Sequence, residues 1–484
     1  MACIDGVEGR ERRGLPSSFN VALRIAENVN MTGNSTNGLQ EQLEAAIDAT
    51  GVTGASLAIW DGTALHTAVA GVRNSVTGDP MTVDTVMHIG SITKVMNTVL
   101  LMQLVDEGRI ALEDPVVKHL PELRLSDQEA PKKIGCCMLV NHTSGINGEW
   151  LPEYGPDRER IVDSMERCVE LDQLHAPGEA TSYCNMATVI AGYLTQKLRG
   201  VSWYTLMKTR IYEPLEMRHA LVDPLDTPRF RCSVGDLTNP KTAKMVQTTR
   251  PFLAPSFAPA GSTQMTSAAD LVTFARAQLN GGVGLNGVRI LSERSAARMV
   301  EPTTAFVSPA WQMGLGWMIL PGGVLSHGGS GPGVYSQLYA HPASGRVLAL
   351  LTNCDRGAAL EPIIVAPILE SWTGFKGSTS KRLSGPVNTK PYEGAYENNL
   401  RRVDVFTCDG SLSLRMTAKM DLVDNDTNRG DPPPSVALHA LGDDVFEAVR
   451  LPGTPPAEYR FVQPDSNGRM RFLATGLRLL VRTQ

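Results

Sequence analysis

The chain has 484 residues, a formal net charge of −5, 42% hydrophobic residues and 20% charged residues. This length predicts two or more domains, or one large domain with an appendage, and the composition is that of an ordinary soluble globular protein. The slightly acidic balance argues against a nucleic-acid-binding function, and no apolar run reaches the roughly 18 residues that a membrane-spanning helix needs.

Residues 1–37 predict an N-terminal tail or arm. They begin with the charged stretch MACIDGVEGRERRGLPSSF, which no apolar segment follows, and end in the Asn- and Gly-rich NVNMTGNSTNG. A secretory signal needs an apolar segment behind its charges, so we expect a cytoplasmic protein unless a leader has been lost. We therefore expect the eight cysteines to be free thiols, and no spacing of ligand residues predicts a metal site.

The next segments predict a helix over 39–50, two strands over 54–62 and 64–72, and a helix over 96–110. Asp61-Gly62 separates the two strands and is typical of a hairpin turn. Gly108 follows the apolar run MNTVLLMQLVDE and predicts the end of that helix. The chain therefore opens its folded part with a hairpin and a buried helix.

A mixed, largely helical middle follows, and strands return after it. Helical patterns cover 186–198, 203–215 and 267–282, and strand patterns cover 314–320, 334–342 and 346–353. Strands at both ends with helices between them favour an α/β (α+β) fold over a βαβ array. We expect one antiparallel sheet flanked by helices, with an all-helical subdomain.

The composition changes over 376–390, KGSTSKRLSGPVNTK, which predicts a linker. Residues 391–484 contain short alternating runs broken by Asp-Gly, Gly-Asp and Asn-Gly. This pattern is typical of a small all-β domain, a barrel or a sandwich. The predicted domains are therefore 38–375 and 391–484.

Ser91 and Lys94 are the first pair with chemical potential. On a helix, residues three apart are neighbours, and Ser91 would open that helix. A lysine in apolar surroundings loses proton affinity, so Lys94 could take the proton of a Ser91 nucleophile. The same spacing recurs at Ser378 and Lys381 inside the linker. The spacing alone is therefore weak, and a helix cap with a snorkelling lysine is the alternative.

Two further segments could complete a site. Tyr183 and Asn185 precede an apolar helix; a tyrosine near a lysine can have a depressed pKa and act as a general base, while Asn185 could orient Lys94 and a substrate carbonyl. The alternative for Tyr183 is a half-buried core phenol. After a strand, His327-Gly-Gly-Ser330 would let a ligand approach closely, and the Ser330 amide could form an oxyanion hole with that of Ser91. The alternative is a hairpin turn with an incidental histidine.

The three segments, in this order, resemble the serine β-lactamase and penicillin-binding protein superfamily. Within it they are most similar to the class C β-lactamase-like branch, which includes DD-peptidases, D-aminopeptidases, esterases, other peptidases and acyltransferases. The resemblance covers residues 38–375, and YEGAYENN resembles the first strand of a lipocalin-like barrel. Other family-like segments are NHTSGI (141–146), APGEATSYCN (176–185), YEPLEM (212–217), PAGSTQMTSAADLVTFA (259–275) and SHGGSGPG (326–333).

The resemblance implies a β-lactamase/transpeptidase-like fold and a role for each motif residue. Ser91 would be the nucleophile, Lys94 its activating partner, Tyr183 the general base and the acid to the leaving group, and Asn185 a positioning residue. His327 stands where the family has the lysine of K-T-G. The substrate and oxyanion residues would be Ser91, Gly328, Gly329 and Ser330.

The histidine favours some substrates over others. A neutral His327 supplies less charge for a substrate carboxylate than a lysine does, which favours esters, amides or peptides over penicillins. We expect a serine hydrolase that cleaves a small peptide or ester through a Ser91 acyl-enzyme, without a cofactor. The main alternative is an acyltransferase with the same acyl-enzyme. A true β-lactamase, a DD-peptidase and a non-catalytic binding protein are less favoured, and a homo-oligomer is left open.

Several other residues received weaker predictions. Cys184 could shape the pocket, and His142 is expected to hold a loop. Four aromatic residues could line an acyl pocket, with core packing as the alternative. They are Trp150, Tyr154, Trp311 and Trp317.

Overall fold

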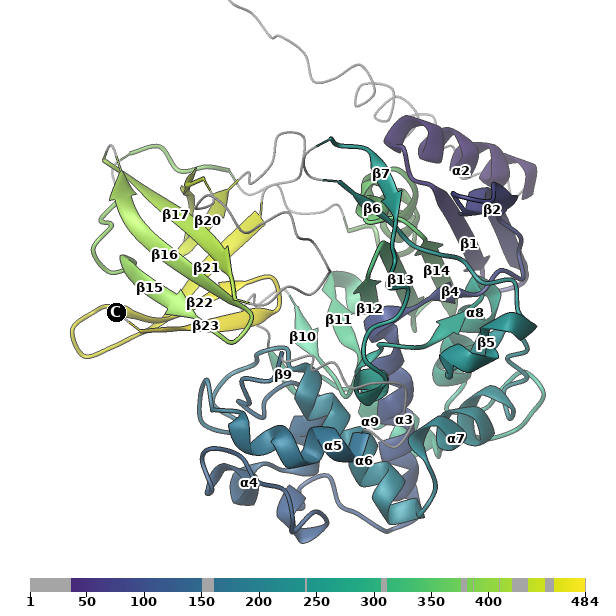
Figure 1. Ribbon diagram of the computed structural model, residues 1–484, viewed down its shortest axis with the longest axis horizontal. Helices are drawn as coiled ribbons and strands as arrows, with labels where there is room; N and C mark the ends of the chain where they lie inside the picture. The colour runs from purple at the N-terminus through teal and green to yellow at the C-terminus, as the bar shows by residue number, and fades with distance from the viewer. Residues whose placement is uncertain are drawn as a thin grey trace, which may run out of the picture.

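The computed structural model describes residues 36–149, 161–239, 242–305, 311–375, 381–385, 387–408, 410–419, 434–448 and 457–483. Figure 1 shows two parts side by side, a large part of helices and strands and a smaller part of strands alone. Almost all of the predicted N-terminal tail, together with Ser378, Trp150 and Tyr154, lies outside the described residues.

A nine-stranded antiparallel sheet forms the centre of the large part. Its order is β3-β2-β1-β14-β13-β12-β11-β10-β9, so β1 of the predicted N-terminal hairpin pairs with β14, for example Ile59 with Leu348, 289 residues later in the chain. The strands are β1 (Gly54–Trp60), β2 (Leu65–Asn74), β3 (Asp79–Pro80), β9 (Thr304–Ala305), β10 (Gln312–Met313), β11 (Met318–Leu320), β12 (Val324–Gly331), β13 (Val334–His341) and β14 (Arg346–Thr352).

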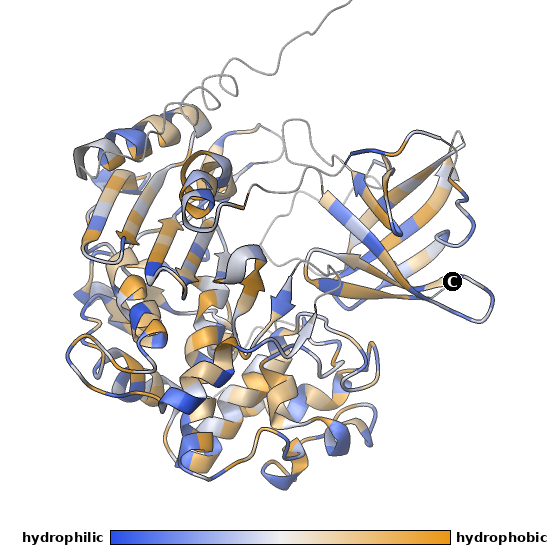
Figure 2. Ribbon diagram, turned by 180° about the vertical axis from the view of Figure 1, so that it is seen from behind, coloured by the Kyte–Doolittle hydropathy of each residue, from blue (hydrophilic) through white to orange (hydrophobic). Residues whose placement is uncertain are grey.

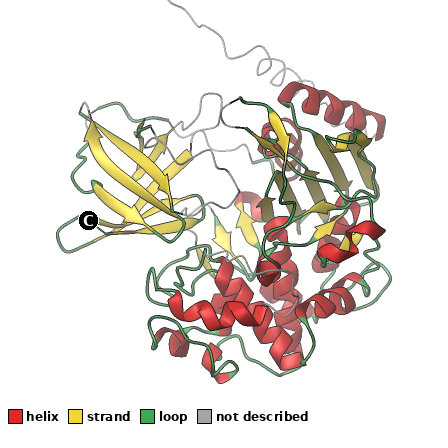
Figure 3. Cartoon of the chain, viewed as in Figure 1, coloured by secondary structure: helices red, strands yellow, loops and turns green. Residues whose placement is uncertain are grey.

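Helices cover both faces of this sheet (Figure 3). The cluster around Leu43, Leu350 and Ile364 lies between the sheet and the helices α2 (Thr36–Thr50) and α10 (Ala366–Thr373). The larger cluster on the other face includes α3 (Thr93–Asp106) and α8 (Ala268–Leu279). α3 is apolar nearly all round, and such a helix is stable only when it is enclosed. Figure 2 shows apolar residues concentrated on these central elements.

The remaining elements of the large part are short helices and small sheets. The helices are α4 (Ala130–Lys133), α5 (Ile161–Glu166), α6 (Asn185–Arg199), α7 (Trp203–Met207) and α9 (Glu293–Val300). The short strands are β4 (Met87–His88), β5 (Ala220–Leu221) and β8 (Met265–Thr266) in one sheet, and β6 (Asp236–Thr238) with β7 (Met245–Gln247) in another. The predicted α/β (α+β) class and the helical subdomain are confirmed.

The small part is a nearly closed all-β barrel. Its strand order is β18-β17-β16-β15-β23-β22-β21-β20-β19, and its two outermost strands follow one another directly in the chain. Inward residues such as Tyr396, Phe461 and Leu480 form its core. The strands are β15 (Gly394–Glu397), β16 (Arg401–Cys408), β17 (Ser411–Ala418), β18 (Val436–Ala437), β19 (His439–Gly442), β20 (Val445–Ala448), β21 (Ala457–Pro464), β22 (Met470–Thr475) and β23 (Arg478–Arg482).

The barrel docks on the large part through the turn between β22 and β23. The Tyr183 amide donates to the Leu477 carbonyl at 2.9 Å, and the Leu479 amide donates to Ser182 Oγ at 3.1 Å. Asn399 and Asn147 form two further hydrogen bonds, each of 2.9 Å. The barrel is thus bonded directly to the segment that carries Tyr183.

The all-β prediction for the C-terminal part is confirmed, while the domain boundaries 38–375 and 391–484 stay a prediction.

Among the described residues, no helix has both the length and the apolar character needed to cross a bilayer.

Candidate active site

Ser91 lies in a 3₁₀ turn, Gly90–Ile92, that leads into α3. This turn packs backbone to backbone against β12. A Cβ on Gly90 would lie 2.7 Å from the Ser330 nitrogen, and a Cβ on Gly329 would lie 1.9 Å from the Ile89 carbonyl oxygen. Two glycines therefore permit the close approach. The fold brings Ser91 beside the Gly328–Ser330 segment, as the sequence predicts.

Lys94 lies beneath Ser91 as the second residue of α3, one turn after the serine. Its Nζ is 2.9 Å from Ser91 Oγ and 2.6 Å from the Ala260 carbonyl oxygen, and the side chain is 2% exposed. Burial lowers the pKa of Lys94 to about 7, partly offset by the negative charge of Glu149. The expected loss of proton affinity is confirmed, and a large fraction of Lys94 is neutral at physiological pH.

Tyr183 stands above the same pair. Lys94 Nζ lies 4.9 Å from the centre of its ring, and the phenol hydrogen-bonds with Ser91. Burial raises the pKa of Tyr183 well above its usual value, and this effect exceeds the opposing effects of Ser91 and Arg478. The predicted depression of the tyrosine pKa is therefore wrong, because loss of solvation outweighs the nearby cations. Tyr183 is a neutral phenol at pH 7.

The sequence predicts that Asn185, at the start of α6, orients Lys94, but its described hydrogen bond goes to another residue. Among the hydrogen bonds of the described residues, its Nδ2 donates to Glu149 Oε2 at 2.9 Å, and none joins it to Lys94. The same carboxylate oxygen accepts from Arg478 Nη2 at 2.7 Å. Glu149 therefore holds the Asn185 amide and the Arg478 guanidinium together.

Arg478 comes from the barrel and was not predicted. It begins β23, and its guanidinium carbon lies 4.7 Å from the centre of the Tyr183 ring. Arg478 and Glu149 both place a charge near Tyr183, and neither residue belongs to the three sequence motifs. The two residues are 329 positions apart, so no local pattern could have paired them.

His327, on β12, is buried within the site. Its Nδ1 lies 2.7 Å from the Gly328 carbonyl oxygen, and its ring centre is 6.2 Å from that of Tyr183. Burial, together with the charge of Lys94, lowers the pKa of His327 to about 3. The predicted neutral histidine is confirmed.

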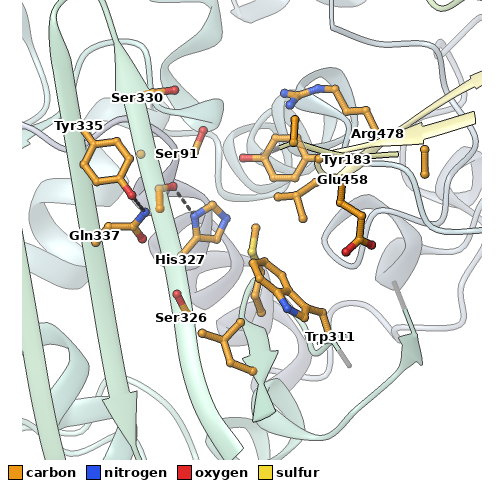
Figure 4. A pocket seen from close by; sticks show the side chains of 18 of the residues that line it. Ser91, Tyr183, Trp311, Ser326, His327, Ser330, Tyr335, Gln337, Glu458 and Arg478 are labelled. Carbon is orange, nitrogen blue, oxygen red and sulfur yellow. Dashed lines mark hydrogen bonds between the residues drawn. The ribbon is translucent and has the colours of Figure 1, made fainter. Parts of the chain in front are cut away.

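A cavity of about 650 Å³ opens above these residues. Figure 4 shows Ser91, His327 and Tyr183 on one side, with Arg478 and Glu458 of the barrel beyond Tyr183. The barrel contributes Ala457, Glu458, Arg460, Ala474, Gly476, Leu477 and Arg478 to the lining. The C-terminal barrel therefore forms one wall of the cavity.

The weaker predictions divide between pocket and core. Trp311 lines the cavity, whereas Trp317 is fully buried in the main core. His142 packs against the Tyr183 ring at 4.3 Å, and its Nδ1 accepts from the Cys184 amide at 3.2 Å, which suits the expected loop-holding role. The Cys184 sulfur accepts from the Ala187 amide and caps α6, so its described contact is structural.

The sequence and the fold both have known counterparts. The model of the Beta-lactamase family matches residues 39–365. Penicillin-binding protein 4 of Amycolatopsis lactamdurans is 31% identical over 379 residues, which cover 74% of this chain and 96% of that protein.

Two solved structures are also similar. The structure of SurE aligns with a TM-score of 0.72 and 25% identity, covering 92% of this chain and 99% of SurE. A D-stereospecific amidohydrolase from Streptomyces sp. aligns with a TM-score of 0.52 and 29% identity, covering 68% of this chain and 99% of that one.

Proposed function

The chain belongs to the Beta-lactamase family and is a serine hydrolase of that family; on this premise we propose that it cleaves an amide or ester bond of a small peptide or ester through an acyl-enzyme on Ser91. The observation that carries the proposal is the buried Lys94 amine 2.9 Å from Ser91 Oγ at the floor of the cavity. A nucleophile beside a poised base is what acyl transfer requires.

In acylation, neutral Lys94 takes the proton of Ser91 while Oγ attacks the substrate carbonyl. The amides of Ser91 and Ser330 then hold the oxyanion. Tyr183 gives its phenolic proton to the leaving nitrogen or oxygen, and the C–N or C–O bond breaks. The Lys94 ammonium and Arg478 both lie within 5 Å of the ring centre and stabilise the transient phenolate. Lys94 then returns the proton to Tyr183, which restores both groups.

Deacylation repeats these transfers with an incoming nucleophile. Tyr183 takes the proton of water as the water attacks the acyl carbonyl, and it passes its own phenolic proton to neutral Lys94 at the same time. The Lys94 ammonium then gives this proton to Ser91 Oγ as the ester bond breaks, which restores all three groups. An alcohol or amine in place of water would make the protein an acyltransferase. The wall that the barrel adds to the cavity favours this second candidate, since it offers surface to hold an acceptor.

The substrate is proposed to be an uncharged or peptide-like acyl donor rather than a penicillin. His327 is neutral and offers no cation to a carboxylate. The similarity to a D-stereospecific amidohydrolase supports a D-configured residue next to the scissile bond. The cytoplasmic location and the lack of a cofactor stay predictions of the sequence, and a homo-oligomer stays open.

A substrate panel tests the proposal. It contains p-nitrophenyl acetate, D- and L-alanine amides, a linear peptide with a D-residue, and nitrocefin, each with and without hydroxylamine as acceptor. We expect turnover of esters or D-amides at least 100-fold faster than that of nitrocefin. Hydroxamate formation at the expense of acid would favour acyl transfer. Turnover of nitrocefin alone would overturn the substrate assignment.

The activity is expected to rise with pH through about 7. Lys94 must be neutral to accept a proton, and burial lowers its pKa to about 7, so it is charged and inactive below that pH. His327 stays neutral and Tyr183 stays protonated from pH 5 to 9. The measurement is kcat/KM for p-nitrophenyl acetate, which has no titrating group, across this range. A flat profile, or one that falls with pH, would contradict Lys94 as the base.

A further inference from the structure

The tautomer of His327 follows from a single contact. Its Nδ1 lies 2.7 Å from the Gly328 carbonyl oxygen, which can only accept a hydrogen bond. Nδ1 therefore carries the proton. Since the ring is neutral, Nε2 bears a lone pair and can only accept.

This Nε2 has no partner among the described residues. It is buried without a hydrogen bond, and the whole side chain is 1% exposed. A buried polar atom without a partner costs free energy, and native proteins rarely leave one unsatisfied without a reason. The His327 ring lines the cavity and projects from β12 towards Tyr183, between Ser91 and Trp311 (Figure 4). A molecule bound in the cavity can supply a donor for this lone pair.

The neighbouring wall of the cavity also presents acceptors. The hydroxyls of Tyr335 and Tyr339 donate to the Glu361 carboxylate, at 3.1 Å and 3.2 Å. Their hydrogens are thereby used, and only their oxygen lone pairs can face a ligand. Gln337 donates its amide nitrogen to Tyr335 at 2.7 Å. These side chains of β13 offer no charged donor to a carboxylate. The cavity is also lined by Arg460 and Arg478, and these arginines already pair with Glu458 at 3.5 Å and with Glu149 at 2.7 Å.

We propose that His327 Nε2 accepts a hydrogen bond from an N–H or O–H group of the substrate beside the scissile carbonyl, and so selects peptide-like acyl donors over carboxylate-bearing ones. This inference rests on the proposed function and names its substrate class. His327 is then a specificity-determining residue, which acts through its lone pair and not through charge.

A pair of isosteric esters tests the proposal. The p-nitrophenyl esters of N-acetyl-D-alanine and O-acetyl-D-lactate differ only in N–H against O at one position. After normalisation to their alkaline hydrolysis rates, we expect wild type to prefer the N–H ester about tenfold in kcat/KM, the value of one hydrogen bond. The ratio should fall to about one in His327→Leu. The matched control His439→Leu, an exposed barrel residue, should keep the wild-type ratio.

The reverse exchange gives a second, positive result. His327→Lys should improve kcat/KM for mono-p-nitrophenyl succinate at least tenfold, because an ammonium attracts the carboxylate that wild type disfavours. A wild-type ratio near one would overturn the proposal even if no variant folds. The proposal would also be overturned if His327→Leu kept the wild-type ratio of kcat/KM between the two esters while still reacting with a fluorophosphonate at Ser91. A wild-type protein that does not react with the fluorophosphonate at Ser91 would instead refute the proposed function.

Discussion

Replacing Lys94 with methionine is expected to lower kcat/KM for p-nitrophenyl acetate by about 10³-fold, within the range of a lost general base. Methionine fills a similar volume but cannot take the Ser91 proton or donate to the Ala260 carbonyl. The free energy of unfolding should change little or rise, because the enclosed amine is itself costly to bury. A low activity with an intact fold would separate the chemical effect from misfolding.

The chain offers a matched control for this substitution. Lys381 has a serine three residues before it, as Lys94 does, but lies in the predicted linker and is exposed. Lys381→Met should therefore keep full activity. If Lys94→Met retains more than a tenth of the wild-type kcat/KM, Lys94 is not the base.

Replacing Glu149 with glutamine should lower the free energy of unfolding by about 3 kcal/mol. This figure is the low end of the range for breaking a buried ion pair, since 23% of the Arg478 side chain stays exposed. Glutamine keeps the shape of the side chain but leaves the Arg478 charge without its partner. Chemical denaturation followed by circular dichroism measures the change.

A control pair and a double variant sharpen this test. Glu129 and Lys132 form an exposed pair, with 63% and 61% of the side chains exposed, so Glu129→Gln should change stability by less than about 1 kcal/mol. Glu149→Leu alone should also destabilise the protein, because it leaves the Arg478 charge without a partner. Adding Arg478→Leu to Glu149→Leu should recover most of that lost stability, because neither charge remains. Equal effects of Glu149→Gln and Glu129→Gln would show that the pair does not hold the barrel.

Local sequence signals were sufficient for much of the fold. The Asp61-Gly62 hairpin, the enclosed helix after Ser91 and the short strands of the barrel each follow from residue spacing within one segment. The meeting of Ser91 with Ser330 also agrees with the ordered motifs, and Gly90 and Gly329 supply its physical cause.

The electrostatics of the site could not be predicted in the same way. The pKa of Tyr183 depends mainly on how completely packing removes water from the phenol, and no residue spacing reveals this. The partner of Asn185 is Glu149, 36 residues earlier in the chain, and no motif spacing links these two residues. Arg478 reaches the site only because the barrel docks on Ser182 and Tyr183.

The identity of the nucleophile is the central claim, and covalent labelling tests it most directly. The intact protein is treated with a fluorophosphonate, its mass is measured, and the modified peptide is sequenced. We expect one adduct, on Ser91 in HIGSITK, and none on Ser91→Ala, whose kcat/KM should also fall by about 10⁴-fold or more. An equal adduct on Ser91→Ala, or a wild-type protein that takes up no label, would contradict the account.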